Sequence, residues 1–589
     1  MALTAQQIAE QRQQAEELLF SGPQTLGFAK GLFFGHFNAA LVFPYPEIKQ
    51  EERDTVAKEV AEVRRFAEES IDAAAIDRNA EIPQSVIDGL ARLGVLGMTA
   101  PPEFGGKGFS QLGYCRIMEV IGGHCPATAI FVNAHHSIGI RSLLLFGTDE
   151  QKRRWLPSLV RGQDLAAFAL TEPQAGSDAA NVQTTATPSP DGRTYILNGE
   201  KRYITNGAIA KVLTVMARTP VAGSNDTKVT AFLVTPDMPG FEVVEARMPK
   251  CGIRGTATAR LAFRNMPVPA ENVLGQVGKG LRVALTVLDF GRTTFGASCT
   301  GASKVCLKAA IAHAKKRVQF KQTLSEFELV KKKIAYMAAH AFAMEATVSQ
   351  CASFIDRGAE DYMLETAMLK VWSTEALWQI VNDTIQIYGG QAYFTNEPYE
   401  RMMRDARINQ IGEGANDVLR AFIAMVGMKS VGDQLLNVKN ALAHPVRDFG
   451  ALFSFGRKQL ESRLSTPEVP VQSVSLRSEA HDLGKRVAEF GRAVQGVLIR
   501  YKEAILERQY VQERISEAAC ELYASSCTLS RLDQLLTMGN GSPAELNREV
   551  IAGRYFMKLA DRRIRQNLAA LTENDDEMTT TTANTFLGS

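Results

Sequence analysis

The sequence predicts an α+β protein in which helical regions flank a central antiparallel β domain, with a further helical domain at the C-terminal end. Apolar residues recur at helical spacing before residue 165 and again after 279. Between these regions, short β-branched and aromatic segments alternate with Gly, Pro, Asn and Asp, as in strands and turns. The length of 589 residues suits about four domain-sized units. We expect an N-terminal extension (1–46), a helical domain (47–165), the β domain (166–278), a helical bundle (279–430), a linker (431–477), a C-terminal helical domain (478–571) and a flexible tail (572–589).

The N-terminal extension begins with an amphipathic helical pattern, MALTAQQIAEQRQQAEELLF. It lacks the basic start and apolar core of a secretory signal, and its glutamates argue against a mitochondrial transit peptide. The apolar stretch GLFFGHFNAALVF (31–43) is shorter than the roughly 20 residues that span a bilayer. We expect it to pack on the protein's own surface or on a partner.

The regular elements then follow in order. DTVAKEVAEVRRFAEES has helical apolar spacing, and PQSVIDGLARLG ends in glycine as helices often do. The expected strands are AAFALTE, TYILNGE, KVLTVMAR, KVTAFLVT, FEVVEAR and ARLAFRN. The β domain ends near MPVPAENVLG, because its prolines cannot lie in a central strand.

The region after the bundle contains a linker by composition, STPEVPVQSVS (465–475). Just before it, HPVRDFGALFSFGRKQLESRL (444–464) is basic and offers apolar residues at Phe449, Leu452, Phe453 and Phe455. Such a segment suits peripheral contact with a membrane surface or an internal docking helix, and the pattern does not separate the two. The acidic and polar residues 572–589 are expected to fray.

Composition excludes several functional classes. A net charge of +2 gives no electrostatic case for nucleic acid binding. The eight cysteines form no CxxC pair, so neither a zinc site nor a disulfide framework is indicated. His135 and His136 are adjacent and cannot share a helix face, which favours packed or hydrogen-bonded histidines over metal ligands. GNGSPA (539–544) resembles a dinucleotide-binding glycine pattern but follows no strand.

Two candidate ligand motifs lie in the β domain. FALTEPQAGSDAANVQT runs from a strand into a turn that carries Thr171 and Ser177, whose hydroxyls suit a phosphate or a planar polar ring. In GEKRYITNGA, Tyr203 and Thr205 alternate and share one strand face, which suits a flavin edge. The alternatives are an ordinary decorated turn and a surface hairpin.

Three further motifs lie in the predicted bundle. In LDFGRTTFG, Asp289 and Arg292 share a helix face, and Arg292 suits either an anionic ligand or a local ion pair. KKRVQF carries Arg317 and Phe320, and the glycine pair in QIYGGQAYF ends a helix and exposes backbone to a large neighbour. QIGEGANDVLR places Glu413 between two glycines, either as a solvated residue near a helix start or as a group that contacts a ligand.

Together these motifs resemble the acyl-CoA dehydrogenases over residues 50–430. The resemblance rests on LTEPQAGSD, YITNGA, KCGIRGTAT with VPAENVLG, RVQF, IQIYGG and EGAND. The long C-terminal part, VFPYPE and AHHSIG resemble the very-long-chain branch, which includes a paralogue serving respiratory complex I assembly. The resemblance implies a helical domain, a β domain, a four-helix bundle and an extra helical domain, with FAD between the β domain and the bundle of a homodimer whose neighbour helps to bind it.

The resemblance also assigns roles to matching positions. Glu413 matches the catalytic base, Asp289 and Arg292 match the CoA-side contacts, and Ser177 lies near the flavin phosphates or the substrate. Gly412 and Gly414 flank the base on the substrate side. The positions that match FAD contacts are Phe168, Leu170, Thr171, Ser177, Tyr203, Ile204, Thr205, Arg317, Phe320, Gln386, Gly389, Gly390, Ala415 and Asn416.

The implied activity is an oxidoreductase reaction on a CH–CH bond in fatty acid beta-oxidation, a part of lipid metabolism. Glu413 takes the α-proton of an acyl-CoA while the β-hydrogen leaves as hydride to flavin N5, giving a trans-2-enoyl-CoA, with an electron-transfer flavoprotein as acceptor. Some branches place the base immediately before the CoA-side arginine, but that position is Gly291 here. Ala127, Ala129 and Gly412 favour a long or bulky acyl group, with plain helix packing as the alternative for the alanines. The expected location is the bacterial cytoplasm, at most peripheral to the inner membrane.

Departures from the family pattern support a second interpretation. Ala415 replaces a threonine, Tyr203 replaces a tryptophan, Lys321 replaces a frequent glycine and Lys331 replaces a glutamine. All four positions lie on the FAD side, so a scaffold or assembly protein with little catalysis is the alternative to the enzyme. A weaker third option is an oxygen-using acyl-CoA oxidase, which would form peroxide without an external acceptor.

Overall fold

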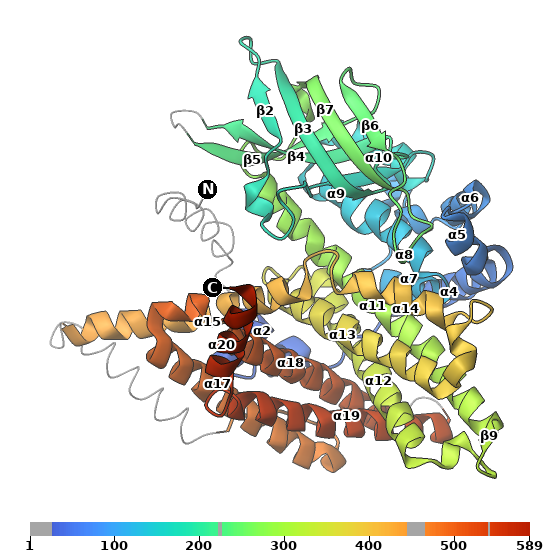
Figure 1. Cartoon of the computed structure of the whole chain (residues 1–589), viewed down its shortest axis with the longest axis vertical. Coiled ribbons are helices and arrows are strands. Elements are labelled where there is room, and N and C mark those ends of the chain that lie inside the picture. Colours follow the sequence, from blue (N-terminus) through green and yellow to red (C-terminus); the bar gives the residue numbers. More distant parts are fainter. Residues whose placement is uncertain (1–25, 222–225, 444–465, 540–541, 589) are drawn as a thin grey trace.

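A computed structural model describes residues 26–221, 226–443, 466–539 and 542–588. The β domain stands at the top of Figure 1, the long helices of the bundle cross beneath it, and the C-terminal helices lie at the lower left. The predicted order of helices, sheet, helices and appended helices is confirmed. The segment 444–464, for which membrane contact was considered, lies outside the described residues.

The N-terminal helical domain consists of α4 (Gln50–Ser70), α5 (Ala73–Asn79), α6 (Gln84–Arg92), α7 (Gln111–His124), α8 (Pro126–Val132), α9 (Arg141–Phe146) and α10 (Asp149–Val160). Helix α4 carries Glu51 and Glu52 in its first turn, where the helix dipole favours negative charge. It buries Val56, Val63 and Ala67, which lie along one stripe. Helix α10 begins with a capping box between Thr148 and Gln151.

A π-helical segment, η3 (Asn133–Ile140), joins α8 to α9 without a break. The combined helix Pro126–Phe146 has the length and apolar composition of a membrane span, but 67% of its most apolar window is buried inside the protein, as in a core helix. His135 on η3 accepts a hydrogen bond at Nδ1 from the Ala166 amide (2.9 Å), and its Nε2 lies 3.1 Å from the Leu159 carbonyl oxygen. The expected hydrogen-bonded role of this histidine is confirmed, and it joins η3 to the first strand.

The β domain is one sheet with the order β6-β7-β3-β2-β4-β5-β8, and β1 also pairs with β4. Its strands are β1 (Ala166–Ala169), β2 (Thr185–Pro188), β3 (Thr194–Thr205), β4 (Val212–Pro220), β5 (Thr227–Val234), β6 (Phe241–Glu245), β7 (Thr258–Pro269) and β8 (Val273–Leu274). The expected antiparallel pairing holds for most neighbours, but β1 and β2 both pair with β4 in parallel. The sheet is therefore mixed. A register shift between Lys201 and Ile204 inserts an extra residue into β3 just before the YITNGA turn.

The bundle is built from α11 (Gly280–Lys316), α12 (Glu328–Asp356), α13 (Met363–Tyr388) and α15 (Asn416–Ala443), with the shorter α14 (Tyr399–Asn409) before the last. Helix α15 continues past residue 430 to Ala443, so the bundle extends into the predicted linker. At 37 residues, α11 is roughly 55 Å long at 1.5 Å per residue. It runs from the β domain to the far end of the bundle, near the small hairpin strand β9 (Val318–Gln319) (Figure 1).

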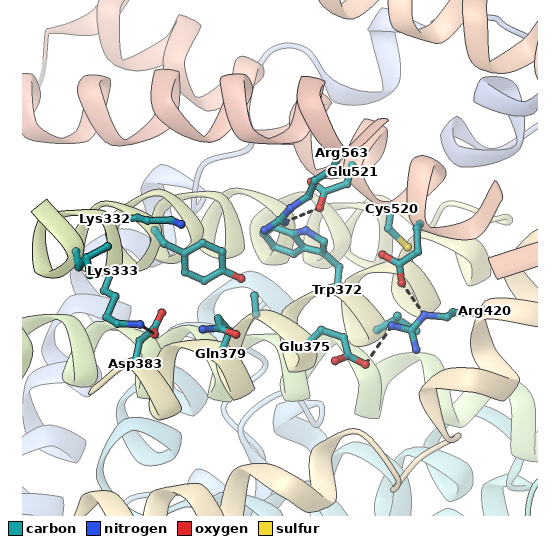
Figure 2. Close-up of a pocket in the computed structure, with 15 residues that line it drawn as sticks. Lys332, Lys333, Trp372, Glu375, Gln379, Asp383, Arg420, Cys520, Glu521 and Arg563 are labelled. Carbon is teal, nitrogen blue, oxygen red and sulfur yellow. Dashed lines mark hydrogen bonds and ion pairs between the residues drawn. The ribbon is translucent and has the colours of Figure 1, made fainter. Parts of the chain in front are cut away.

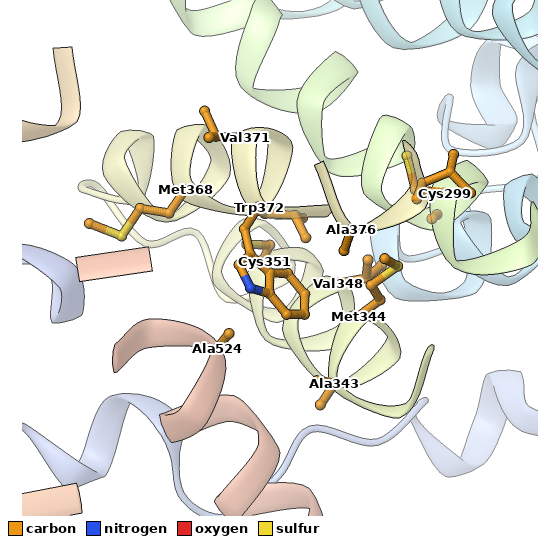
Figure 3. Close-up of a cluster of buried hydrophobic side chains, with 14 of the residues drawn as sticks. Cys299, Ala343, Met344, Val348, Cys351, Met368, Val371, Trp372, Ala376 and Ala524 are labelled. Carbon is orange, nitrogen blue, oxygen red and sulfur yellow. The ribbon is translucent and has the colours of Figure 1, made fainter. Parts of the chain in front are cut away.

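The C-terminal domain, with α17 (Arg477–Tyr501), α18 (Gln509–Met538) and α19 (Pro543–Ala569), packs against the bundle. Side chains from α11, α12, α13 and α18 meet in one apolar core, where Ala524 faces Cys351 and Trp372 (Figure 3). The short helix α2 (Phe28–Phe33) belongs to the same core, with the Phe33 ring 5.1 Å from that of Phe490. The apolar 31–43 stretch therefore packs on the protein itself.

The acidic tail forms a helix, α20 (Asp576–Leu587), so the expectation of a frayed tail is wrong for these residues. None of the residues of α20 is buried. Its first turn carries Asp576, whose carboxylate accepts two hydrogen bonds from Arg514 at 2.5 and 2.9 Å. This charge-assisted pair at the helix N-terminus stabilises a segment whose composition predicts disorder.

Candidate active site

Glu413 lies in the turn between α14 and α15 with a backbone φ of +54°, and Gly414 follows at +101°. Left-handed φ is uncommon for a residue with a side chain, and such residues persist where the surrounding structure holds them. Here the Gly412 amide donates to the Ile408 carbonyl (2.8 Å) and the Asn416 amide donates to that of Gln410 (2.9 Å). The turn therefore presents the Glu413 side chain inward.

The Glu413 carboxylate is shielded from water and only half satisfied. Its Oε1 accepts a hydrogen bond of 2.7 Å from Asn133 Nδ2, whereas Oε2 is buried and has no hydrogen-bond partner among the described residues. Oε2 lies against Gly291 of α11, where an added Cβ would stand only 2.4 Å away. Burial raises the pKa of Glu413 to about 7, against the opposing effects of Arg292, Lys370 and the Asn133 hydrogen bond. A base with a pKa near the working pH suits abstraction of a weakly acidic proton.

Lys370 of α13 anchors the turn that carries Glu413. Its ammonium is fully buried and donates to the Gly414 carbonyl (2.6 Å) and to Asn416 Oδ1 (2.9 Å). Asn416 in turn donates to Thr374 Oγ1 (3.0 Å) and Glu375 Oε1 (2.8 Å). Burial lowers the pKa of Lys370 to about 7. Lys370 is thus a buried amine tied to the same turn as Glu413.

Arg292 and Asp289 are both buried, with exposed fractions of 4% and 6%, so they do not form an ordinary surface ion pair. Arg292 Nη1 lies 3.3 Å from Asp289 Oδ1, which also accepts a 2.7 Å hydrogen bond from Thr366. Arg292 Nε is buried with no hydrogen-bond partner in the described part of the chain. Burial raises the pKa of Asp289 to about 6. The arrangement leaves a guanidinium with spare donor capacity beside Glu413.

The two β-domain motifs meet at the end of β3. The Arg202 amide donates to the Thr171 carbonyl (2.8 Å), and Lys201 Nζ donates to the Leu170 carbonyl (3.1 Å) and to Glu172 Oε1 (2.6 Å). Tyr203 is 57% exposed at φ +63°, and Thr205 is half-buried. Ile204 points into the β-domain core and could offer a ligand only its backbone. The accessible side chains at the end of β3 are thus an aromatic ring and a hydroxyl, and their role in binding a ligand stays a prediction.

The other β-domain positions differ in accessibility. Phe168 is buried in the core that joins the sheet to the helices, Leu170 packs against that core, and Ser177 is exposed. The YITNGA turn reaches the base region through Asn206, whose Nδ2 donates to the Phe131 carbonyl (3.1 Å) two residues before Asn133. The turn at the end of β3 and the Glu413 turn are therefore both hydrogen-bonded to the segment 131–133.

The remaining predicted positions gather at the opposite end of α11. The His313 ring stacks on Tyr388 at 4.0 Å and so joins the ends of α11 and α13. Arg317, Phe320, Gln386, Gly389 and Gly390 are all exposed there, and a Cβ added at either glycine would meet nothing within 4 Å. Arg317 follows the last residue of α11, roughly 40 Å along the helix from Gly291. One chain thus presents two separate sets of predicted ligand contacts.

The predicted acyl-side residues lie deeper in the helices. Ala129 borders a small cavity of about 20 Å³ with Gly122, Phe295 and Ser298, whereas Ala127 packs against the Gly255 turn. A Cβ added at Gly412 would come no closer than 3.6 Å to the Ile408 carbonyl oxygen, so space is open beside the base. Ala415 is half-buried beside Asn416 in the Lys370-bound turn.

A larger cavity of about 580 Å³ lies elsewhere, between α12 and α13 of the bundle and α18 and α19 of the C-terminal domain (Figure 2). Several of its charged side chains are paired: Lys333 with Asp383, Arg420 with Glu517 at 2.6 Å and Arg563 with Glu521 at 2.7 Å. Glu413 does not line this cavity.

Sequence reasoning missed three groups of the site. Asn133, Lys370 and the buried Lys201–Glu172 pair stand in helical or strand patterns that also fit ordinary structure. Lys370 had one signal, a charge in the apolar run AMLKVW, because a buried lysine needs partners. Asn133 had a weaker one, an amide between apolar residues in IFVNAHHS.

The chain thus has a helical–β–helical fold in which a buried carboxylate, Glu413, lies at the turn before the last helix of the bundle. Family profiles match at residues 53–163 (acyl-CoA dehydrogenase, N-terminal domain), 167–266 (middle domain), 278–428 (C-terminal domain) and 474–585 (ACAD9/ACADV, C-terminal domain). The chain belongs to the acyl-CoA dehydrogenase family, and it is an FAD-dependent oxidoreductase.

Individual relatives agree with this assignment. The chain is 35% identical to a very long-chain specific acyl-CoA dehydrogenase, mitochondrial, of Rattus norvegicus, over 94% of this chain and 85% of that protein. It is 33% identical to the probable acyl-CoA dehydrogenase FadE10 of Mycobacterium tuberculosis, over 100% of this chain and 92% of that one. Among solved structures, an acyl-CoA dehydrogenase complexed with FAD from Bacillus anthracis superimposes with a TM-score of 0.79 at 26% identity and covers 94% of each chain.

Proposed function

We propose that Glu413 is the catalytic base of an FAD-dependent dehydrogenation that converts an acyl-CoA into a trans-2-enoyl-CoA. The observation that carries this proposal is the buried Oε2 of Glu413, which has no partner among the described residues and is held in a left-handed turn above Gly291. An unsatisfied buried carboxylate oxygen costs stability, so its retention is typical of a site where a ligand supplies the missing contact.

In this proposal, each residue of the site has its own role in the reaction. Glu413 Oε2 takes the α-proton of the thioester, and desolvation makes the carboxylate a stronger base than it would be in water. Lys370 and Asn416 keep the turn in place, while Arg292 supplies a buried positive charge beside the proton acceptor. The backbone amide of Glu413, flanked by Gly412 and Gly414, is the proposed donor to the thioester oxygen, whose negative charge grows as the proton leaves. When bound, FAD supplies the acceptor for the β-hydrogen as hydride.

The residues present fit FAD. Tyr203 and Thr205 offer a ring face and a hydroxyl next to the base region, and the open backbone at Gly389 and Gly390 gives room for an adenine half beside Arg317. Because roughly 40 Å of α11 separates Gly291, which contacts Glu413, from Arg317, we propose that one flavin does not reach both ends within one chain. We therefore propose a homodimer in which each subunit provides the Arg317 set to its partner's flavin.

Substrate and acceptor follow from the same family membership. Open space at Gly412 and the small residue Ala129 favour a long or bulky acyl group. An electron-transfer flavoprotein is the proposed electron acceptor. A solved structure of an electron transferring flavoprotein of Acidaminococcus fermentans also appears among the structural matches, with a TM-score of 0.60 and 33% identity.

The test is anaerobic titration of the purified holoprotein with acyl-CoAs of graded chain length, following flavin absorbance. Wild-type protein is expected to bleach and Glu413→Gln to stay oxidised. Glu69→Gln, an exposed glutamate on α4, is the matched control and should bleach like the wild type. Full-speed bleaching of Glu413→Gln would overturn the role of the base. A yellow wild-type protein that no acyl-CoA bleaches would instead favour the scaffold interpretation.

A further inference from the structure

Resting on the proposed role of Glu413, we infer that Asn133 is a positioning residue for the base. Its amide engages one carboxylate oxygen and leaves the other free to receive the proton. Asn133 belongs to none of the motifs that identify the family in this chain. It is 2% exposed and lies 280 residues from Glu413 along the chain.

The geometry fixes which end of the Asn133 amide faces the base. A carboxylate only accepts hydrogen bonds, so the NH2 end must face Glu413 Oε1, which lies 2.7 Å from Nδ2. The carbonyl end accepts a short hydrogen bond from the Thr294 hydroxyl on α11. Both ends of the amide are therefore occupied in a manner that a flipped amide could not reproduce.

A chain of buried hydroxyls continues behind Thr294. Thr294 Oγ1 lies 3.2 Å from Ser137 Oγ, and Ser137 Oγ lies 3.3 Å from the Tyr114 hydroxyl. All of these side chains are at most 1% exposed, so no solvent competes for their hydrogen bonds. In a low dielectric, such a connected network holds its members more firmly than separate bonds do.

The backbone around Asn133 is also unusual. Asn133 is the first residue of the π-helical segment η3, which holds Ser137 as well. π-helical turns are rare and occur frequently at functional sites. The side chains of Asn133 and Ser137 both extend from η3 towards α11, where each contacts the hydroxyl of Thr294.

Comparison with other buried asparagines separates this role from ordinary structure. Asn206 Nδ2 donates to the Phe131 backbone carbonyl and Asn272 Nδ2 to that of Leu233. Those two satisfy backbone groups, as buried amides commonly do. Asn416 is also buried and donates to the Glu375 carboxylate (2.8 Å), but that carboxylate has no part in the proposed reaction. Asn133 donates to the carboxylate that the proposed reaction uses.

The electrostatic consequence follows from the groups around the carboxylate. The charged groups facing Glu413 are Arg292 from α11 and Lys370 from α13, with Asp289 paired behind Arg292. A hydrogen bond donated to the ionised form favours that form, so Asn133 acts with the two cations against burial. Its removal should make Glu413 harder to ionise.

The experiment measures the pH dependence of the reductive half-reaction in holoprotein variants, together with exchange of the substrate α-protons into deuterium oxide. Asn133→Ala is expected to move the acid limb of the profile upward by about one pH unit, with near wild-type rates on the alkaline plateau. Asn133→Asp should move it further, because a second carboxyl then faces the base. Asn272→Ala, which loses a buried amide remote from Glu413, should leave the profile unchanged.

Other outcomes separate this inference from the proposed function. If Asn133→Ala does not fold, Thr294→Val keeps the amide but removes the hydroxyl that orients it, and it should shift the same limb in the same direction. If Glu413→Gln is inactive while the pH profiles of the Asn133 and Thr294 variants superimpose on that of the wild type, the positioning role of Asn133 is refuted. The role of Glu413 as base is then retained. If Glu413→Gln keeps full turnover, the proposed function itself fails.

Discussion

Gly291→Ala is expected to increase stability and reduce catalysis, although it adds one methyl group. Gly291 lies inside α11, where alanine is favoured over glycine by about 1 kcal/mol. The new Cβ would stand 2.4 Å from Glu413 Oε2 and 3.1 Å from its Cδ, whereas ordinary contacts begin near 3.4 Å. The carboxylate must therefore move by about 1 Å, which as the end of a flexible side chain it can do at little cost to folding.

The effect on catalysis follows from that displacement. A misplacement of about 1 Å at a reacting group can lower the rate about 100-fold, equivalent to about 2.7 kcal/mol of activation free energy. The assays are thermal unfolding and stopped-flow flavin reduction by a saturating acyl-CoA. Gly496→Ala in α17 is the matched control, because a Cβ there meets nothing within 4 Å. It should raise stability by a similar amount and leave flavin reduction unchanged.

One result would refute the reasoning. If Gly291→Ala reduces its flavin at the wild-type rate, the carboxylate does not need its position above Gly291, and the proposed geometry of proton abstraction is wrong. A loss of activity accompanied by a loss of stability equal to that of a core mutation would also count against it. Besides Glu413, the nearest atom to the new Cβ is Ile138 Cγ2 at 3.1 Å, which needs to move by only a few tenths of an ångström.

Four further predictions concern the same site and its far end. Glu413→Gln should stabilise the fold by up to about 3 kcal/mol above pH 7. The pKa of Glu413 is about 7 in the folded protein and 4.5 in the unfolded chain, so ionisation of Glu413 opposes folding. Thermal melts should show this gain shrinking below pH 7 and vanishing below pH 4.5. Lys370→Met should move the acid limb of flavin reduction upward and slow it roughly tenfold near neutral pH, because it removes both a cation and the donor to the Gly414 carbonyl; an unchanged profile would exclude this role. Arg317→Ala should lower the bound flavin per subunit without changing the melting temperature of the apoprotein, since Arg317 is exposed. Gly412→Tyr should fold normally but lower kcat/KM for long acyl chains more than for short ones, because a side chain there enters open space beside the base; equal losses across chain lengths would contradict this.

The order of domains could be predicted because each rests on local patterns that the structure preserves. Helical spacing in α4 and the short β-branched, apolar segments of β4 and β5 need no knowledge of distant residues. The parallel pairings of β1 and β2 with β4 could not be read in this way, since strand direction depends on how the chain crosses the sheet. The helix at 576–587 was missed because an ion pair to Arg514, on another helix, supports a segment with no buried residue of its own.

The same contrast between local sequence patterns and contacts with distant residues applies to the candidate active site. Glu413 stands out locally because glycines on both sides are unusual before a helix. Asn133 and Lys370 do not, because their importance comes from contacts with a turn that lies 280 and more than 40 residues away. The extra residue in β3 that sets Tyr203 at a positive φ is likewise invisible without the partner strand.

The distribution of charge explains why this site needs residues outside the recognisable motifs. Before reaction, one carboxylate, Glu413, faces two buried cations, Arg292 and Lys370, while Asp289 offsets part of the charge on Arg292. In the proposed reaction, proton transfer would neutralise Glu413 and move its negative charge to the thioester oxygen, which the positive groups would then stabilise. Because the positive groups are fixed by the fold, they need no rearrangement as the charge moves, which is the condition for electrostatic stabilisation of a transition state. Lys370 donates to the Gly414 carbonyl, and Asn133 is held by Thr294. We propose that these contacts keep Glu413 and the positive groups in the same relative positions during that step.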